Sequence, residues 1–462
     1  MEKDSSNSSK PPSSDPPFAG GAASRERPPR KPKKRKPRGG HKRRVRTPFA
    51  SDHVHRHVDH HDPRSNPSLW EPVPEQPDHP DGDPAWSVLQ QIDFQKKHSR
   101  FRVTEHRFRV YRRVGGCGKT RTTPRPKRLR PGRPGSGLFG PGMIAYVNTA
   151  RWQLRASLSG LQRFLFETLD LRVSTGYLAK VLCSVTEPLK EAYEDIREAV
   201  RASGVIYADE TPHRETTAGG TTLSYSWCVS SLIDEATLLC VGRSRATGQL
   251  EEILDHPATP FCGVIHSDFY SAYGKYTREH EGVASQYCWA HLIREVRAVG
   301  RLPAEGASTW SDAMERAIDE LFAGWHAGDP AACRRARDSL LEKCEPWMPW
   351  VHTKVENLRK RLIKHARSYF RFIETPGNLQ DRKIQPTNNH AERCVRPVVM
   401  LRGSTQGTRS ERGRRWWERV GSVALTLRQR RAGLFDFLER TVRAAARGLT
   451  PPSPLAGAQL AS

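Results

Sequence analysis

Apolar side chains change their spacing at a few points along the chain, and each spacing predicts a different kind of element. Over residues 142–200 they recur every three or four positions, which predicts amphipathic helices. After a short connection, Ser174 is placed to cap a second helix. Two helices joined in this way resemble a helix-turn-helix, whose second helix enters the major groove of DNA. A helical hairpin that packs on the next domain is the alternative. The first helix carries on one face Leu158, Leu161, Leu165 and Leu169.

From residue 205 the pattern changes to short apolar strands. Residues 205–209 are apolar and β-branched and end in Asp209, and residues 264–268 form another short strand-like run that ends in Asp268. If the two strands are neighbours, both carboxylates lie at one edge of a sheet, where a hard metal ion finds its ligands. For each aspartate taken separately, a helix cap or a turn is the alternative. Further strands are predicted over 225–231 and 237–241, with a helix over 248–254.

A long helical segment follows, over residues 289–375. Its apolar residues repeat at helical spacing in two stripes, 310–325 and 351–366, which we interpret as core. Cys288 and His291 stand at its start. One Cys and one His without a second pair do not predict a zinc site.

The N-terminal part has a different composition. Residues 1–95 are rich in Ser, Pro, His and charge and poor in aliphatic side chains, so we expect disorder. Thirteen Lys and Arg against one Glu over 25–46 suit a nonspecific DNA tether, and a merely solvated run is the alternative. Residues 101–114 then alternate as a strand does. A flexible segment without Cys partners is not expected to hold a metal through His53, His55, His57, His60 and His61.

The composition of the chain favours a protein that binds nucleic acid. The 462 residues carry a formal net charge of +26, which suits a nucleic-acid partner better than a small-molecule substrate. Between Glu392 and Arg447 there are fourteen Arg and no Lys, and guanidinium groups bind phosphate bidentately. Nine cysteines without a Cys-x-x-Cys pair indicate reduced thiols. No apolar run reaches the roughly 18 residues of a membrane span, so we expect a soluble, cytoplasmic protein without membrane contact.

Four motifs in order carry a resemblance to a known family. Together they resemble the bacterial insertion-sequence transposases of family sixty-six, over about residues 142–433. The resemblance implies an α/β, ribonuclease-H-like catalytic domain with a DDE triad and a helical insertion before its Glu. The motifs are Ala208-Asp209-Glu210-Thr211-Pro212, Asp268-Phe269-Tyr270-Ser271-Ala272-Tyr273, Cys288-Trp289-Ala290-His291, and Asn388-Asn389-His390-Ala391-Glu392-Arg393 continuing to Arg396-Pro397.

Carried over residue by residue, the triad is Asp209, Asp268 and Glu392, which would hold two Mg²⁺ ions, or Mn²⁺ in their place. DNA contacts are expected from Asn388, Asn389, Arg393, Arg396 and Arg402. For the three arginines, nonspecific surface charge is the alternative. Trp416 and Trp417 either stack on bases or pack a helix on the sheet, and we favour packing.

The chain also departs from the family. Members commonly carry a zinc-ribbon-like pair of Cys-x-x-Cys motifs upstream, whereas Cys117 is the only cysteine before the helical region. We therefore expect a degenerate zinc-ribbon-like segment and linker. Phe269 stands where the family often has Gly.

The expected organisation has seven parts. They are a disordered tail (1–95), the degenerate ribbon and linker (96–141), a helical DNA-binding region (142–200), the first catalytic part (201–288), the helical insertion (289–375), the second catalytic part (376–433), and a C-terminal helix and tail (434–462). The expected activity is cleavage at element ends and strand transfer into target DNA. Expected partners are the terminal inverted repeats, target DNA, further copies of the chain and element-encoded accessory proteins, in the nucleoid. A transposase-derived DNA binder without catalysis, and a stand-alone nuclease, are the alternatives.

Overall fold

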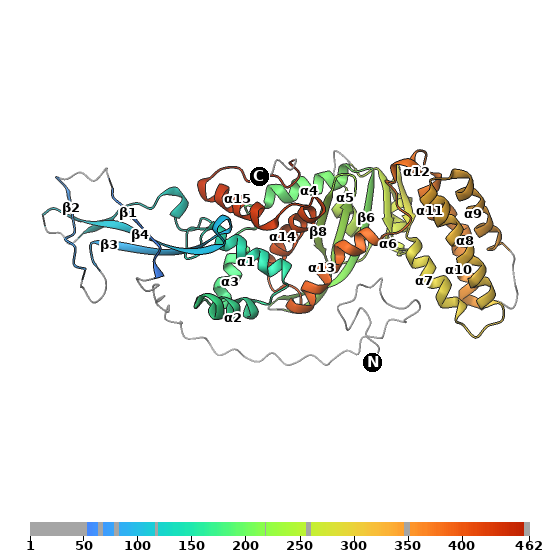
Figure 1. Ribbon diagram of the computed structural model, residues 1–462, viewed down its shortest axis with the longest axis horizontal. Coiled ribbons are helices and arrows are strands. Elements are labelled where there is room, and N and C mark those ends of the chain that lie inside the picture. The colour runs from blue at the N-terminus through green and yellow to red at the C-terminus, as the bar shows by residue number, and fades with distance from the viewer. Residues whose placement is uncertain are drawn as a thin grey trace. The chain divides into compact units, whose positions relative to one another are not determined.

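A computed structural model describes residues 53–62, 68–77, 83–115, 119–217, 219–255, 260–345 and 352–456. Within these residues the chain forms fifteen α-helices and two five-stranded sheets, a mixed α/β protein (Figure 1). It divides into two compact units. The larger contains the described residues of Val147–Phe437 and those from Pro451 onward, and the smaller contains the described residues before Val147 together with Leu438–Thr450. The predicted DNA tether over 25–46 lies outside the described residues.

The smaller unit is built around one long strand, β4 (Arg100–Arg113), as the alternating pattern predicted. β4 pairs in antiparallel fashion with β2 (Trp70–Pro72), β3 (Trp86–Gln95) and β5 (Thr120–Thr122), and in parallel with β1 (Arg56–His60). The prediction of disorder up to residue 95 is therefore wrong for β1, β2 and β3. These segments hold few aliphatic residues, but β3 pairs with β4 along its whole length and buries Ile92 in the same sheet as Phe108. A composition count within one segment does not capture such long-range pairing.

The sheet of the larger unit has the order β10-β9-β6-β7-β8. β6 (Val205–Thr217), β7 (Gly220–Ser231) and β8 (Ala236–Gly242) form an antiparallel meander. On the other side of β6, β9 (Gly263–Ser267) and β10 (Val283–Tyr287) run parallel to it. The four predicted strands are confirmed. β6 does not stop at Asp209 but continues to Thr217, because β7 pairs with it as far as the hairpin at Gly220.

Helices cover this sheet. α14 (Glu411–Gln429) and α4 (Lys190–Ala202) pack on β8, and α13 (Asn389–Thr405) packs on β6 and β7. α5 (Thr247–Leu254) and α6 (Ser271–Glu279) lie in the crossovers before and after β9. On α14, Trp416 and Trp417 are both buried, and the Trp417 indole donates to Ser226 Oγ at 3.1 Å. The predicted packing on the sheet is confirmed for Trp417, whereas Trp416 packs against Trp152 and donates to Asn148 Oδ1 at 2.7 Å, outside the sheet.

The predicted helical insertion separates β10 from α13. It contains α7 (Trp289–Gly300), α8 (Ala307–Ala327), α9 (Pro330–Glu342), α10 (Thr353–Lys364), α11 (Ala366–Glu374) and α12 (Asn378–Asp381), which Figure 1 draws in yellow to orange. Buried residues of both apolar stripes, among them Met314 and Leu358, lie in one core cluster, which also includes Trp289 and Tyr207 of β6. The insertion is thus packed against the strand that carries Asp209.

The remaining helices are α1 (Pro141–Gln153), α2 (Leu158–Leu169), α3 (Thr175–Cys183) and α15 (Leu434–Arg447). The predicted pair 158–183 is confirmed as helical, and Ser174 Oγ accepts from Tyr177 N as an N-cap at 3.1 Å. The boundary between the two units falls inside α1 and α15. Among the described helices, none combines the length and the hydropathy that a membrane span requires.

Candidate active site

Two aspartates stand at the same level on neighbouring parallel strands, Asp209 within β6 and Asp268 directly after β9. In the ladder between β6 and β9, Tyr207 pairs with His266, and Asp209 and Asp268 each stand two residues further along. Neighbouring strands are about 4.8 Å apart, so both carboxylates belong to one edge of the sheet. Asp268 is the first residue after β9, where its Oδ1 accepts from Tyr270 N at 3.0 Å and turns the chain toward α6. The predicted neighbour relationship of the two strands is confirmed.

The third acid, Glu392, is held near these strands by Asn388, the residue that precedes α13. The buried Asn388 side chain donates from Nδ2 to the Ala208 carbonyl at 2.8 Å, which ties α13 to the residue before Asp209. The Asn388 backbone N–H donates to Cys288 Sγ at 3.1 Å. One turn on, Glu392 N donates to the Asn388 carbonyl at 3.2 Å. A single asparagine therefore connects the β6 edge, the start of α7 and the first turn of α13.

The acids repel one another in the absence of a cation. The pKa of Asp209 lies well above its usual range, first because it is buried and then because of the negative charge of Glu210, Asp268 and Glu392. Burial and the charge of Glu210 raise the pKa of Asp268 to about 7, with a smaller contribution from Glu392. Asp209 Oδ2 is buried and has no hydrogen-bond partner. A buried, unpartnered carboxylate oxygen among like charges is an arrangement that a divalent cation stabilises.

Glu210 is also buried but is fully occupied by protein groups. Its carboxylate forms an ion pair with Arg245 and accepts from the Tyr273 hydroxyl. The Arg245 guanidinium in turn lies over the Tyr270 ring, 4.0 Å from its centre. Sequence analysis assigned no role to either partner: Arg245 stands in none of the four motifs, and Tyr273 belongs to the Asp268 motif but is five residues from its acid. Strand alternation directs Glu210 away from Asp209, which is the signal that separates the two acids.

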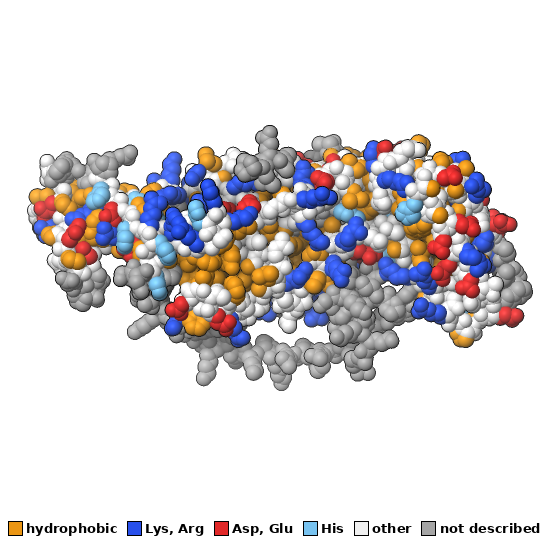
Figure 2. All heavy atoms as spheres, in the orientation of Figure 1, with side chains coloured by type: hydrophobic (Ala, Val, Ile, Leu, Met, Phe, Trp, Pro, Cys, Tyr) orange, Lys and Arg blue, Asp and Glu red, His pale blue; other side chains and the backbone are white. Residues whose placement is uncertain are grey.

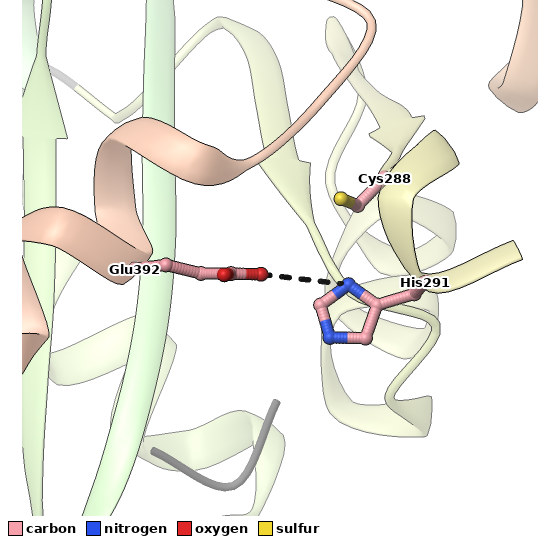
Figure 3. A group of neighbouring side chains, drawn as sticks. All are labelled: Cys288, His291 and Glu392. Carbon is pink, nitrogen blue, oxygen red and sulfur yellow. Dashed lines mark ion pairs between the residues drawn. The ribbon is translucent and has the colours of Figure 1, made fainter. Parts of the chain in front are cut away.

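Glu392 faces the start of α7 (Figure 3). Its Oε1 lies 3.3 Å from Arg294 Nη2 and 3.9 Å from His291 Nδ1. The ligand atoms of Cys288, His291 and Glu392 all lie within 4.8 Å of one another, the one such group of metal-ligating side chains in the part of the chain that the structure describes. The three predicted carboxylates influence one another's charge without forming so close a group. Burial, with Arg294 and Arg361 nearby, lowers the pKa of His291 to about 4, so the imidazole is neutral.

The five predicted DNA contacts separate into two sets. Asn389, Arg393 and Arg396 are exposed at the start of α13. Asn388 is buried and bonded to Ala208, and Arg402 is half-buried, with Nη1 donating to Thr211 Oγ1 at 2.8 Å and to the Pro212 carbonyl. The last two therefore bind the protein itself and connect α13 to β6. Figure 2 shows Lys and Arg side chains spread over the visible face.

Comparison with known proteins gives two findings. The family model described as "Transposase IS66 family" matches residues 136–415, a range that includes all three acids and the α7 motif. The chain is also 24% identical over 340 residues to an uncharacterized protein, y4qI, of Sinorhizobium fredii. That alignment covers 68% of this chain and 61% of the relative, so the chain spans less than two thirds of the relative's length.

Proposed function

The chain belongs to the transposase IS66 family, and from this premise we propose that it cleaves DNA at the ends of an insertion element and joins those ends to target DNA. Asp209, Asp268 and Glu392 would be the catalytic carboxylates. The observation that carries the proposal is the position of the acids: Asp209 and Asp268 stand at the same level on the neighbouring strands β6 and β9, and Asn388, at the start of the helix that carries Glu392, is bonded to the carbonyl of Ala208.

The sheet topology supports a ribonuclease-H-like fold for the larger unit. An antiparallel meander, β6-β7-β8, is followed by two strands parallel to β6. The helix α13, which carries Glu392, packs on β6, the central strand of the sheet. Under this proposal, α7 to α12 are the family's insertion, and α2 and α3 are the DNA-binding helices. Contacts with terminal repeats, assembly of further copies on DNA, accessory proteins and action in the nucleoid belong to the same proposal.

The acids fit divalent metal. Asp209 offers a buried, unpartnered oxygen, and oxygen-only ligands suit Mg²⁺, or Mn²⁺ in its place. Asp209 would hold both of two ions, while Asp268 and Glu392 would each hold mainly one. Two such ions in one site stabilise the attacking and the leaving oxygen of an in-line displacement.

The proposed reaction has two steps. Water attacks a phosphodiester at the element end, and the 3′ oxygen leaves as a hydroxyl. This hydroxyl then attacks a phosphodiester of the target strand, whose own 3′ oxygen leaves. Arg393 and Arg396, exposed on the helix that carries Glu392, would pair with the phosphates of the bound strand. Asn388 and Arg402 would act as positioning residues, because their side chains connect α13 to β6.

The test uses labelled element-end DNA with Mg²⁺. Asp209→Asn should abolish cleavage and joining while folding and DNA binding persist, and Glu392→Gln should behave in the same way. Glu281→Gln, at an exposed acid in the loop before β10, is the matched control and should keep activity. Cleavage by the Asp209→Asn protein in Mg²⁺ would show that the assignment is wrong. Footprints on terminal repeats without nicking would favour the inactive DNA binder, and cutting without joining would favour the nuclease.

A further inference from the structure

The Cys288, His291 and Glu392 cluster has a different chemistry from the carboxylates of the proposed triad. It combines a sulfur, a nitrogen and a carboxylate oxygen within 4.8 Å of one another (Figure 3). Thiolate and imidazole ligands select Zn²⁺ and similar ions, whereas Mg²⁺ takes oxygen ligands. Sequence analysis considered Cys288 and His291 but did not predict a site, because the third ligand, Glu392, lies about one hundred positions after them.

The cluster is anchored by the backbone on both sides. Cys288 stands at the N-cap of α7 and His291 three residues later, so both side chains leave the same face of the first turn. The Cys288 N–H donates to the Ser267 carbonyl at 2.9 Å, and its sulfur accepts from Asn388 N at 3.1 Å. Cys288 is 2% exposed. His291 Nδ1 is buried and has no hydrogen-bond partner, although the ring faces Glu392. A buried nitrogen without a partner is costly unless something binds it.

We propose that Cys288, His291 and Glu392 form a binding site for a transition-metal dication of the Zn²⁺ type, with a fourth position left to water. Binding releases the thiol proton, and the resulting thiolate and the Glu392 carboxylate together neutralise the ion. The Arg294 contact with Glu392, 3.3 Å long, competes with the ion and must lengthen when it binds.

Sharing Glu392 has a functional consequence, which rests on the proposed function. A carboxylate that coordinates an ion beside Cys288 and His291 is withdrawn from Asp209 and Asp268. The ion at the α7 site therefore inhibits Mg²⁺-dependent cleavage by occupying Glu392, without binding Asp209 or Asp268.

The binding test uses the full chain, with Co²⁺ as a spectroscopic probe and Zn²⁺ in competition with a chromophoric chelator. The wild type should bind about one ion per chain with a cobalt–thiolate charge-transfer band. Cys288→Ser and His291→Asn should each weaken binding at least about tenfold, since even loss of outer-shell partners costs that much. Cys262→Ser removes an exposed thiol elsewhere and should bind as the wild type does. The histidines of the N-terminal part cannot produce a thiolate band, so they do not confuse the result.

Both variants should fold, because serine retains an acceptor for the Asn388 N–H and His291→Asn leaves Cys288 intact. If one variant fails to fold, the other still tests the site. Circular dichroism checks the folding of both. An unchanged thiolate band and affinity in both folded variants would refute the site.

The inhibition test compares the ratio of cleavage with and without Zn²⁺ between the wild type and His291→Asn, at constant Mg²⁺. Strong inhibition of the wild type with a clearly weaker effect on His291→Asn supports the shared ligand, and equal inhibition overturns it. A wild type that binds Zn²⁺ but never cleaves in Mg²⁺ alone would count against the proposed function and not against the site.

Discussion

Asp268→Asn should make the metal-free protein more stable at alkaline pH, although it removes a residue of the proposed triad. In the folded protein, burial and the neighbouring acids raise the pKa of Asp268 from 3.8 to about 7. The ionised side chain is therefore less favourable in the folded chain than in the unfolded one. Asparagine keeps the shape and removes the charge.

The magnitude follows from the pKa. Each tenfold change in proton affinity corresponds to about 1.4 kcal/mol, so the full effect is about 4 kcal/mol. Because the folded pKa is raised, the folded state binds more protons between the two pKa values, and stability falls as pH rises from about 4 to about 7. From about pH 5.5 to about pH 8.5 the wild type should lose about 2 kcal/mol of stability through this group. The loss occurs over the roughly 1.5 pH units between pH 5.5 and the folded-state pKa of about 7, at about 1.4 kcal/mol per unit. The Asn variant should lose less than the wild type.

The assay is urea unfolding of both proteins at the two pH values, in the presence of a chelator and again with Mg²⁺. Without metal the variant should be the more stable protein at both pH values, by about 4 kcal/mol at the higher one and by about 2 kcal/mol at the lower one. Added Mg²⁺ should stabilise the wild type, because a ligand that binds only the folded state raises its stability. The ion should have little effect on the variant, because the variant lacks the carboxylate of Asp268.

Glu210→Gln provides the matched control with the opposite sign. Glu210 is a buried acid next to Asp209, but it is paired with Arg245 and Tyr273, so loss of its charge should destabilise the protein. If Asp268→Asn has no stability advantage at the higher pH, or the same advantage at both, the acids do not repel one another and the argument for a cation site at this edge fails.

Two further predictions concern α13. Asn388→Ala should lower the free energy of unfolding by about 1–3 kcal/mol, because the Ala208 carbonyl loses the Asn388 donor. Asn389→Ala, at the exposed neighbouring residue, is the control and should change the free energy of unfolding by less than about 0.5 kcal/mol. Thermal unfolding of both variants measures the difference. Arg393→Gln should weaken DNA binding and lower the slope of log affinity against log salt by about 1, with stability unchanged. Arg402→Gln should reduce stability, because the variant loses the hydrogen bonds to Thr211 and Pro212 of β6. If Arg402→Gln keeps its stability and lowers the salt slope of DNA binding as much as Arg393→Gln does, the positioning role of Arg402 is wrong.

Local pattern was enough to identify the elements that carry the two aspartates. Each strand is a short apolar run that ends in an acid, and the helical stripes of the insertion repeat over several turns, so neighbouring residues alone specify them. The end of β6 was not predictable in this way. Residues 210–217 form a strand because β7 pairs with them, and pairing is a property of two segments.

The sequence by itself indicated four of the five strands of the larger unit, its two long helical regions, the family and the identity of three candidate acids. Only the tertiary structure decided that β1, β2 and β3 assemble on β4, that Asn388 and Arg402 are bonded inside the protein, and that Glu392 lies beside Cys288 and His291. The physical reason is range: periodicity reports which face of an element is apolar, whereas the partner of a polar side chain depends on which distant segments the fold brings within hydrogen-bond distance.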